Sequence, residues 1–403
     1  MTVTIGIDPH KRSHTAAALD EAEELLGVVR VEAGPHQLGQ LLAFAAAFAP
    51  RRFAVEGADG LGLLLAQQLL AAGETVLDVP PKLAARARLL GNRRSAKNDA
   101  NDSVSVAAAA MRSPLVRPAA PEDATVVLKL WARRSSDLAR DRTRLVNRLH
   151  ALLAELVPGG AARRLTADRA QALLEGLGPQ GTVGAARLVL AGQLLDELRH
   201  LDGQLAQAKA QLKAAVAASG SSLTGLYGVG PFVAATVLGE VGDVARFTDR
   251  AHFAAYNGTA PVEVSSGDHR RHRLSMRGNR RLNHALHIAA VAQARAKGGP
   301  GRAYYDRKRA EGKSHKEALR ALKRRLSDAV FVVLQADASR AEVTEVGPGG
   351  QAGNGSMASV AGSHPEHRLF GEATPGPVAT LEPQPPARPR PSQHRPKETR
   401  QAS

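Results

Sequence analysis

Four carboxylates occupy positions where they could hold metal ions. Asp8 ends the apolar stretch TVTIGID, Glu56 ends FAVE, and Asp99 and Asp102 lie three residues apart in KNDANDS. An acidic residue that ends a buried strand lies at the carboxyl edge of a sheet, where α/β proteins place their sites. Carboxylates from several elements can surround two Mg²⁺ ions, an arrangement that serves phosphoryl transfer. Taken singly, each residue also fits a structural role, such as a helix N-cap or a turn.

A second stretch with chemical potential begins at two adjacent serines, Ser265 and Ser266. A run of arginines follows them: Arg270, Arg271, Arg273, Arg277, Arg280 and Arg281. Guanidinium groups bind phosphate oxygens through paired hydrogen bonds, so this stretch could surround a scissile phosphate. From residue types alone, the favoured interpretation is a basic loop that contacts phosphates, with both serines in ordinary hydrogen bonds.

The composition favours a polyanionic partner and removes some chemistries. Lys and Arg total 54 against 38 for Asp and Glu, a formal net charge of +16, and nucleic acid is the first candidate for such a basic chain. The chain contains no cysteine, which excludes disulfides, thiolate metal sites and a cysteine nucleophile. Neither a signal peptide nor a membrane-spanning stretch is expected, so we predict a bacterial cytoplasmic, nucleoid-associated protein with no membrane partner.

The elements that must position the four carboxylates form an α/β pattern. Three strands are expected first, at 2–8, 14–20 and 25–32; a helix (36–49), a strand (52–57), a helix (62–73), a strand (75–80) and a helix (99–111) follow. The first three strands are predicted to form an antiparallel meander. This order predicts a mixed sheet with helices on its faces, and it resembles the order of RNase H-like domains.

The middle of the chain, residues 120–218, has a helical period. Apolar residues spaced three and four apart run through 137–157 and 194–218, with Pro158 and two glycines between them. Two long amphipathic helices predict an antiparallel hairpin or a dimerising coiled coil, while an ordinary helical bundle within one subunit fits equally well.

Residues 222–337 are expected to form a mainly helical, basic unit. Gly228 and Gly230 lie in a short turn that has the form of a helix-hairpin-helix, whose backbone N–H groups approach a phosphate. A close helix crossing that needs glycine is an equally good interpretation. The stretch 342–403 is rich in proline and basic residues and is predicted to be a disordered tail.

The motifs IGIDPHK, AVEG, VPPKLAARAR and KNDANDS resemble the N-terminal domain of DEDD-type insertion-sequence transposases, which is similar to RuvC resolvases. The resemblance implies that residues 1–115 form a RuvC-like catalytic domain in which Asp8, Glu56, Asp99 and Asp102 bind Mg²⁺ or Mn²⁺. Two departures leave the carboxylates in place: GADG follows Glu56 where the family has Thr-Gly, and Ser103 replaces the usual alanine.

The stretches GVGPFVAATVL, AAYNGTAP, SSG and RGNRRL resemble the C-terminal domain of the same family. The resemblance implies that a serine attacks DNA and forms a covalent phosphoserine intermediate. The spacing from Gly258 to Pro261 assigns that role to Ser266, with Ser265 as the alternative. It also implies phosphate contacts from the glycine turn and the arginine run.

The resemblance implies that the protein binds DNA, both the ends of the element and the target, and that a bridge RNA guides the choice of site. It also implies a dimer or tetramer that is held together by residues 120–218. In this assembly, protomers would complete each other's active site. Two alternatives stay open. One is a junction resolvase or nuclease that uses water as the nucleophile, and the other is a nucleic-acid-binding protein without activity.

Overall fold

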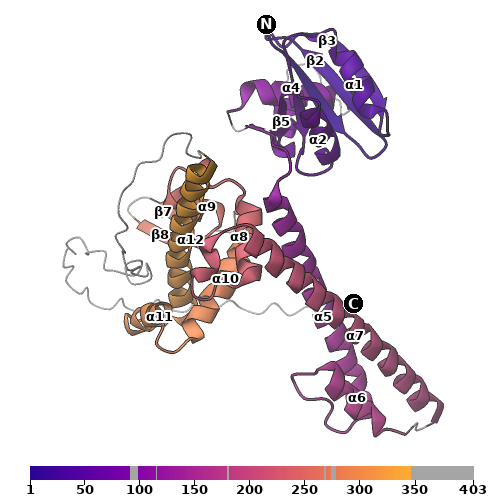
Figure 1. The fold of residues 1–403 in the computed structure, drawn as a ribbon, viewed down its shortest axis with the longest axis vertical. Coiled ribbons are helices and arrows are strands. Elements are labelled where there is room, and N and C mark those ends of the chain that lie inside the picture. Colours follow the sequence, from indigo (N-terminus) through magenta and orange to yellow (C-terminus); the bar gives the residue numbers. More distant parts are fainter. Residues whose placement is uncertain (91–98, 115, 179–180, 267–268, 274–277, 346–403) are drawn as a thin grey trace, which may run out of the picture.

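The computed structural model describes residues 1–90, 99–114, 116–178, 181–266, 269–273 and 278–345. Figure 1 shows an α/β unit that contains the N-terminus, a long helical hairpin, and a mainly helical C-terminal unit beside one end of that hairpin. No helix among the described residues is long and apolar enough to cross a membrane.

The α/β unit is built on a six-stranded mixed sheet with the order β3-β2-β1-β4-β5-β6. Its strands are β1 (Val3–Pro9), β2 (Ser13–Leu19), β3 (Leu25–Glu32), β4 (Arg51–Glu56), β5 (Val76–Val79) and the short β6 (Arg117–Pro118). The first three strands are antiparallel, whereas β4 is parallel to both β1 and β5. The mixed sheet is confirmed and fits an RNase H-like α/β fold; β6, which pairs antiparallel with β5, was not predicted.

Helices cover both faces of this sheet. They are α1 (Gln37–Ala45), α2 (Leu63–Ala71), α3 (Pro81–Leu90), which was not predicted, and α4 (Asp99–Arg112). Side chains alternate between faces along a strand, and β4 illustrates this. Phe53 and Val55 share a core with α1 and α2, whereas Ala54 between them packs with α3 and α4.

The middle segment folds as an antiparallel hairpin of α5 (Ala124–Leu156) and α7 (Gly181–Ala218), with α6 (Ala167–Glu175) near its tip (Figure 1). Leu149 of α5 and Leu195 of α7 are buried in one core there. The antiparallel hairpin is therefore formed within one chain. That this segment also joins protomers stays a prediction.

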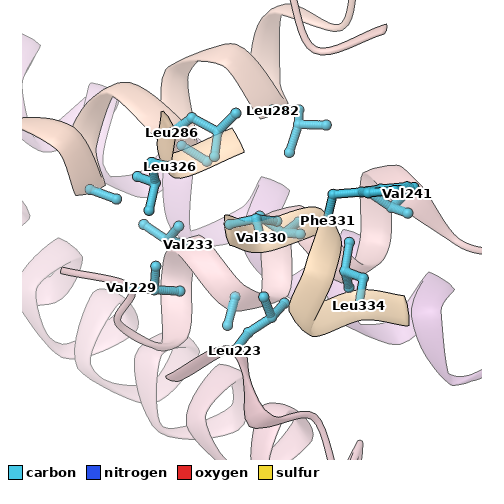
Figure 2. Close-up of a cluster of buried hydrophobic side chains, with 14 of the residues drawn as sticks. Leu223, Val229, Val233, Val241, Leu282, Leu286, Leu326, Val330, Phe331 and Leu334 are labelled. Atoms are coloured by element: carbon cyan, nitrogen blue, oxygen red, sulfur yellow. The ribbon is translucent and has the colours of Figure 1, made fainter. Parts of the chain in front are cut away.

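The C-terminal unit contains η1 (Ser222–Gly225), α8 (Pro231–Val241), η2 (Val244–Arg246), α9 (Arg250–Tyr256), a hairpin of β7 (Val262–Ser266) and β8 (His269–Arg273), α10 (Arg280–Arg295), α11 (Pro300–Ala310) and α12 (His315–Glu345). Figure 2 shows its core, in which Leu223, Val233, Leu286 and Phe331 converge from η1, α8, α10 and α12. Leu128 of α5 and Leu212 of α7 belong to the same core, so the base of the long hairpin packs as part of this unit.

The structure differs from expectation at two places in this unit. The glycine turn follows the four-residue 3₁₀ helix η1 rather than an α-helix, so a helix-hairpin-helix is not confirmed. Gly228 has φ +80°, and a side chain there would lie 2.8 Å from the carbonyl oxygen of Ala289 on α10, a contact that favours the close-crossing interpretation. In addition, α12 runs to Glu345, past residue 337, where the unit was predicted to end, and past residue 342, where the tail was predicted to begin. Asp337 accepts hydrogen bonds from Ser221 and Ser222, and Ala338 packs against the core. The rest of the predicted tail, 346–403, lies outside the described residues.

Candidate active site

The sheet brings two of the four carboxylates together. Strands β1 and β4 are parallel neighbours, and their register pairs Ile7 with Val55, one residue before Asp8 and Glu56. The apolar residues before each carboxylate are fully buried, which fixes both strands in the sheet. Asp8 is 7% exposed, and Glu56 is half-buried. Two acidic groups therefore lie side by side at the carboxyl edge, as the sequence predicted.

Helix α4 supplies the other two carboxylates, and Gly6 controls how closely that helix approaches. A Cβ at Gly6 would overlap the carbonyl oxygen of Ser103 and the backbone nitrogen of Ala107, and it would lie 2.8 Å from the Ala107 Cβ. The backbone of α4 thus rests directly on β1. Asp99 and Asp102 lie in the first turn of the helix. Because the helix contacts β1 only two residues before Asp8, its first turn lies beside that carboxylate.

The pKa of Glu56 shows that the carboxylates lie close to one another. Burial raises the pKa of Glu56 above its ordinary value. The nearby carboxylates of Asp8 and Asp102 raise this pKa further, whereas Arg88 and, to a smaller extent, His10 lower it. Like charges held together in a partly buried site repel one another, and a divalent cation relieves that repulsion.

Asp99 is joined to Asp8 through a histidine. The Nε2 atom of His10 lies 3.2 Å from Oδ2 of Asp8 and 3.6 Å from Oδ1 of Asp99. Each of these three residues offers a ligand atom, and the three atoms lie within 4.8 Å of one another. Carboxylate oxygens suit Mg²⁺ and Mn²⁺, and an imidazole nitrogen also suits later transition metals. The donor set therefore fits a divalent metal ion without singling out magnesium.

Three residues in this site were not predicted as part of it. One is His10, which lies between Asp8 and Asp99. Arg88 of α3 donates from Nη1 to Oδ1 of Asp102 at 2.6 Å and so fixes that carboxylate. Asp78 of β5 accepts a hydrogen bond from the Ala58 backbone N–H at 2.9 Å, which holds the turn after Glu56. The Asp in the apolar stretch TVLDVP was the available signal for Asp78, whereas the partnership of Arg88 depends on the packing of α3.

The serines lie on a separate element. Ser265 and Ser266 are on β7 and pair with Arg270 and His269 of β8 in an antiparallel two-stranded sheet. Figure 1 shows this hairpin beside α9 and α12, apart from the six-stranded sheet. The structure therefore does not bring the serines and the carboxylates of one chain together.

The predicted arginines are placed only in part. Arg270, Arg271 and Arg273 are on β8, and Arg280 and Arg281 begin α10 with exposed side chains. Arg277 lies outside the described residues.

A buried polar network holds the loop that leads into β7. Asn257 is fully buried; its Nδ2 donates to Oγ of Ser327 at 2.7 Å, and its Oδ1 accepts from the backbone N–H and hydroxyl of Thr259. Its carbonyl oxygen accepts from Nδ2 of Asn283, whose Oδ1 accepts from Nζ of Lys323. Residues of α10 and α12 thus fix the point at which the serine hairpin leaves the core.

Comparison with family models covers both functional regions. A DEDD transposase model of IS110 elements matches residues 5–158, and a model described as the transposase IS116/IS110/IS902 family matches residues 220–306. The first range contains the four carboxylates, and the second contains the serine hairpin and all of α10.

Individual relatives are proteins of the insertion elements after which these families are named. An uncharacterized 44.8 kDa protein of insertion element IS116 from Streptomyces clavuligerus is 29% identical over 383 residues, covering 83% of this chain and 94% of the relative. A 43.6 kDa protein of insertion element IS110 from Streptomyces coelicolor is 31% identical over 289 residues, 60% of this chain and 71% of the relative. Among solved structures, T. thermophilus RuvC in complex with a Holliday junction substrate matches with a TM-score of 0.25 and 19% identity, covering 30% of this chain and 100% of that chain.

Proposed function

Because this chain belongs to the IS110 family of DEDD transposases, enzymes that act on DNA, we propose that it cleaves and rejoins DNA strands through a serine whose attack is assisted by metal ions. One observation carries the proposal: acidic groups from β1, β4 and α4 gather at one edge of the sheet, where burial and neighbouring carboxylates raise the pKa of Glu56. Membership in this family removes the alternative of a binding protein without activity.

The metal site of this proposal consists of Asp8, Glu56, Asp99 and Asp102. Divalent ions held there, Mg²⁺ or Mn²⁺, would supply Lewis-acid stabilisation of the charge that develops on phosphate and leaving oxygens. Arg88 holds Asp102 in place by a direct hydrogen bond. Asp78 acts indirectly, because it anchors the turn that follows Glu56.

The nucleophile of this proposal is Ser266 on β7, with Ser265 as the alternative. The Oγ–phosphorus bond forms as the bond to the leaving strand oxygen breaks; Oγ loses its proton, and the leaving oxygen gains one. The phosphodiester energy is kept in the phosphoserine, so the strand can be rejoined without a high-energy cofactor. Family membership supports this assignment, as does the anchored loop from Asn257 that leads into the hairpin.

We place the two half-sites of one reaction on different protomers. The serine hairpin and the sheet lie in separate parts of a single chain (Figure 1). A dimer or tetramer joined through the α5–α7 hairpin would bring the serine of one protomer to the carboxylates of another. The long span of that hairpin supports this role, because two helices of 33 and 38 residues reach far beyond either unit.

The choice of site is assigned to a bridge RNA encoded by the element, which would pair with the element ends and with target DNA. Base pairing would then read sequence while the basic protein binds backbone and shape. The formal charge of +16 supports a large nucleic-acid interface of this kind. The setting is the bacterial cytoplasm, at nucleoid DNA.

The decisive experiment traps the covalent intermediate. The wild-type chain is incubated with labelled substrate DNA, its guide RNA and Mn²⁺, and the denatured products are separated to find DNA attached to protein. We expect an adduct that is absent from Ser266→Ala and from Asp8→Ala. Peptide mapping of the adduct decides between Ser266 and Ser265.

Two outcomes would count against this mechanism. An adduct that persists in both serine variants would show a different nucleophile. Strand cleavage by Ser266→Ala and Ser265→Ala without an adduct, but lost in Asp8→Ala, would instead establish a nuclease that uses water at the four carboxylates. The observation in favour of this second candidate is that the carboxylates gather at a place where Ser265 and Ser266 of the same chain do not lie.

A further inference from the structure

A basic pocket lies where the base of the long hairpin meets the C-terminal unit. It has a volume of about 460 Å³ and is walled by α5, α8 and the first turns of α10. Its basic lining residues are Lys129, Arg133, Arg140, Arg280, Arg281 and His284. Half of these residues come from α5, for which the family resemblance implied only a role in joining protomers.

The charges that line this pocket are out of balance. Five Lys and Arg residues face two carboxylates, Asp137 and Glu240, which leaves a formal charge of +3 with His284 neutral. Asp137 is paired with Arg140. Glu240 has a side chain that is 9% exposed, and it lies 3.7 Å from Arg133 and 3.8 Å from Arg281, so one carboxylate is shared by two guanidinium groups.

Arg133 retains hydrogen-bonding capacity in this pocket. Its Nε is buried without a hydrogen-bond partner among the described residues, and its ion pair with Glu240 is too long for a hydrogen bond. The Glu240 carboxylate instead accepts from Nδ2 of Asn279 at 2.7 Å. The Arg133 side chain as a whole is 39% exposed, so an anion that enters the pocket can reach the end of the guanidinium group.

The start of α10 adds positive potential. The N-terminus of a helix carries a partial positive charge, so Arg280 and Arg281 in the first turn are electrostatically unfavourable there. The Asn279 side chain caps the helix, which satisfies backbone N–H groups but does not neutralise the arginines. The pKa of Lys323 on neighbouring α12 is lowered by burial and then by Arg280 and Arg320. A bound anion would relieve this repulsion.

Close helix packing creates the pocket. A Cβ at Gly239 of α8 would lie 2.7 Å from the Cα of Lys129, so the α5 backbone rests directly on α8 at this glycine. The contact sets Lys129 and Arg133 beside Thr236 and Glu240 of α8. The cationic face of α5 is therefore held rigidly against the unit that carries the serine hairpin.

We propose that this pocket binds a backbone phosphate of a nucleic-acid strand and thereby guides that strand toward the β7–β8 hairpin. Planar guanidinium groups bind phosphate oxygens in pairs, and several converge here. The pocket adjoins α10, which follows the hairpin in the chain after only a few residues. The identity of the anion as nucleic acid rests on the proposed function, whereas the excess of cations does not.

The test measures binding without catalysis. Fluorescence anisotropy in EDTA follows a labelled duplex DNA and a labelled RNA strand of equal length, each over a series of salt concentrations. Arg133→Gln should weaken binding about tenfold and make the dependence of log affinity on log salt shallower by about one phosphate contact. Arg140→Gln, with an exposed side chain, keeps the test valid if Arg133→Gln does not fold.

The matched control is Arg144→Gln, which removes the same charge from an exposed position on α5 outside the pocket. It should change affinity less than about twofold. Equal losses for Arg144→Gln and the pocket variants, or no loss in the pocket variants, would overturn the proposal. A loss confined to DNA or to RNA supports it and identifies the strand. Since no cleavage is measured, this outcome is independent of whether a phosphoserine adduct forms.

Discussion

The carboxylates of the α/β unit lie on two neighbouring strands of a six-stranded sheet and on a helix packed against one of them, whereas the serines of the C-terminal unit lie on a separate two-stranded hairpin. In the first region, the core that stabilises the fold also fixes the distances between reactive groups. In the second, the position of the serines depends on how one loop is anchored. Changes in the two regions should therefore affect activity in different ways.

The largest effect is expected from Gly6→Ala in the α/β unit. The added methyl group would overlap the backbone of α4 at Ser103 and Ala107, so the helix must move and carry Asp99 and Asp102 away from Asp8. We expect strand cleavage to fall about 100-fold, because displacements near 1 Å cost that much. The free energy of unfolding should fall by about 1–3 kcal/mol. Single-turnover cleavage and thermal denaturation measure the two effects.

Gly39→Ala is the matched control for this change. Gly39 lies within α1, and a Cβ there meets nothing within 4 Å. This variant should keep full activity and gain about 0.5–1 kcal/mol of stability. If Gly6→Ala were as active as Gly39→Ala, close contact between α4 and β1 would not be what positions the carboxylates.

A smaller effect is expected from Asn257→Ala in the C-terminal unit. The change removes the hydrogen bonds to Ser327 and Thr259 and deprives both hydroxyl groups of this partner, whereas the Thr259 backbone N–H still donates to the carbonyl oxygen of Ala254. We expect a loss of about 2 kcal/mol in the free energy of unfolding. Formation of the covalent adduct should slow about tenfold through misplacement of the serine hairpin, while Mn²⁺ binding at the carboxylates stays unchanged.

The control for Asn257→Ala is Ser327→Ala, which keeps the bonds between Asn257 and Thr259. It should lose stability but slow adduct formation less. Equal slowing in both variants would indicate a general effect of stability, and weaker Mn²⁺ binding in either would show that the two regions are not independent.

The smallest effect is expected from Arg88→Gln, and it appears in the pH profile. Arg88 lowers the pKa of Glu56, which burial and the carboxylates of Asp8 and Asp102 hold above its ordinary value. Metal binding requires the ionised carboxylate, so affinity is complete above this pKa and is lost as pH falls through it. Removing Arg88 raises the pKa of Glu56 further, so the pH below which Mn²⁺ binding is lost should move to a higher value.

The control is Arg86→Gln, which changes an exposed position on the same helix and should leave this pH unchanged. A shift to lower pH in Arg88→Gln would contradict the role of Arg88 at Glu56.

Much of the α/β unit was predictable because local patterns decide it. Strands such as Val3–Pro9 and Arg51–Glu56 combine apolar runs with a terminal carboxylate, and the element order predicts a mixed sheet. Helix α3 and strand β6 were missed for different reasons. PKLAARARLL has few large apolar residues, and Arg117–Pro118 is a strand only because β5 offers it an edge.

By itself, the sequence determined the types of reactive groups, the elements that carry them and the basic charge of the chain. The tertiary structure decided which groups meet: His10 with Asp8 and Asp99, Arg88 with Asp102, and the cations of α5 with those of α10. The reason is physical. Periodicity fixes the face of a helix or strand on which a residue lies, but the approach of two elements depends on packing at points such as Gly6 and Gly239, where a single missing Cβ lets two backbones touch.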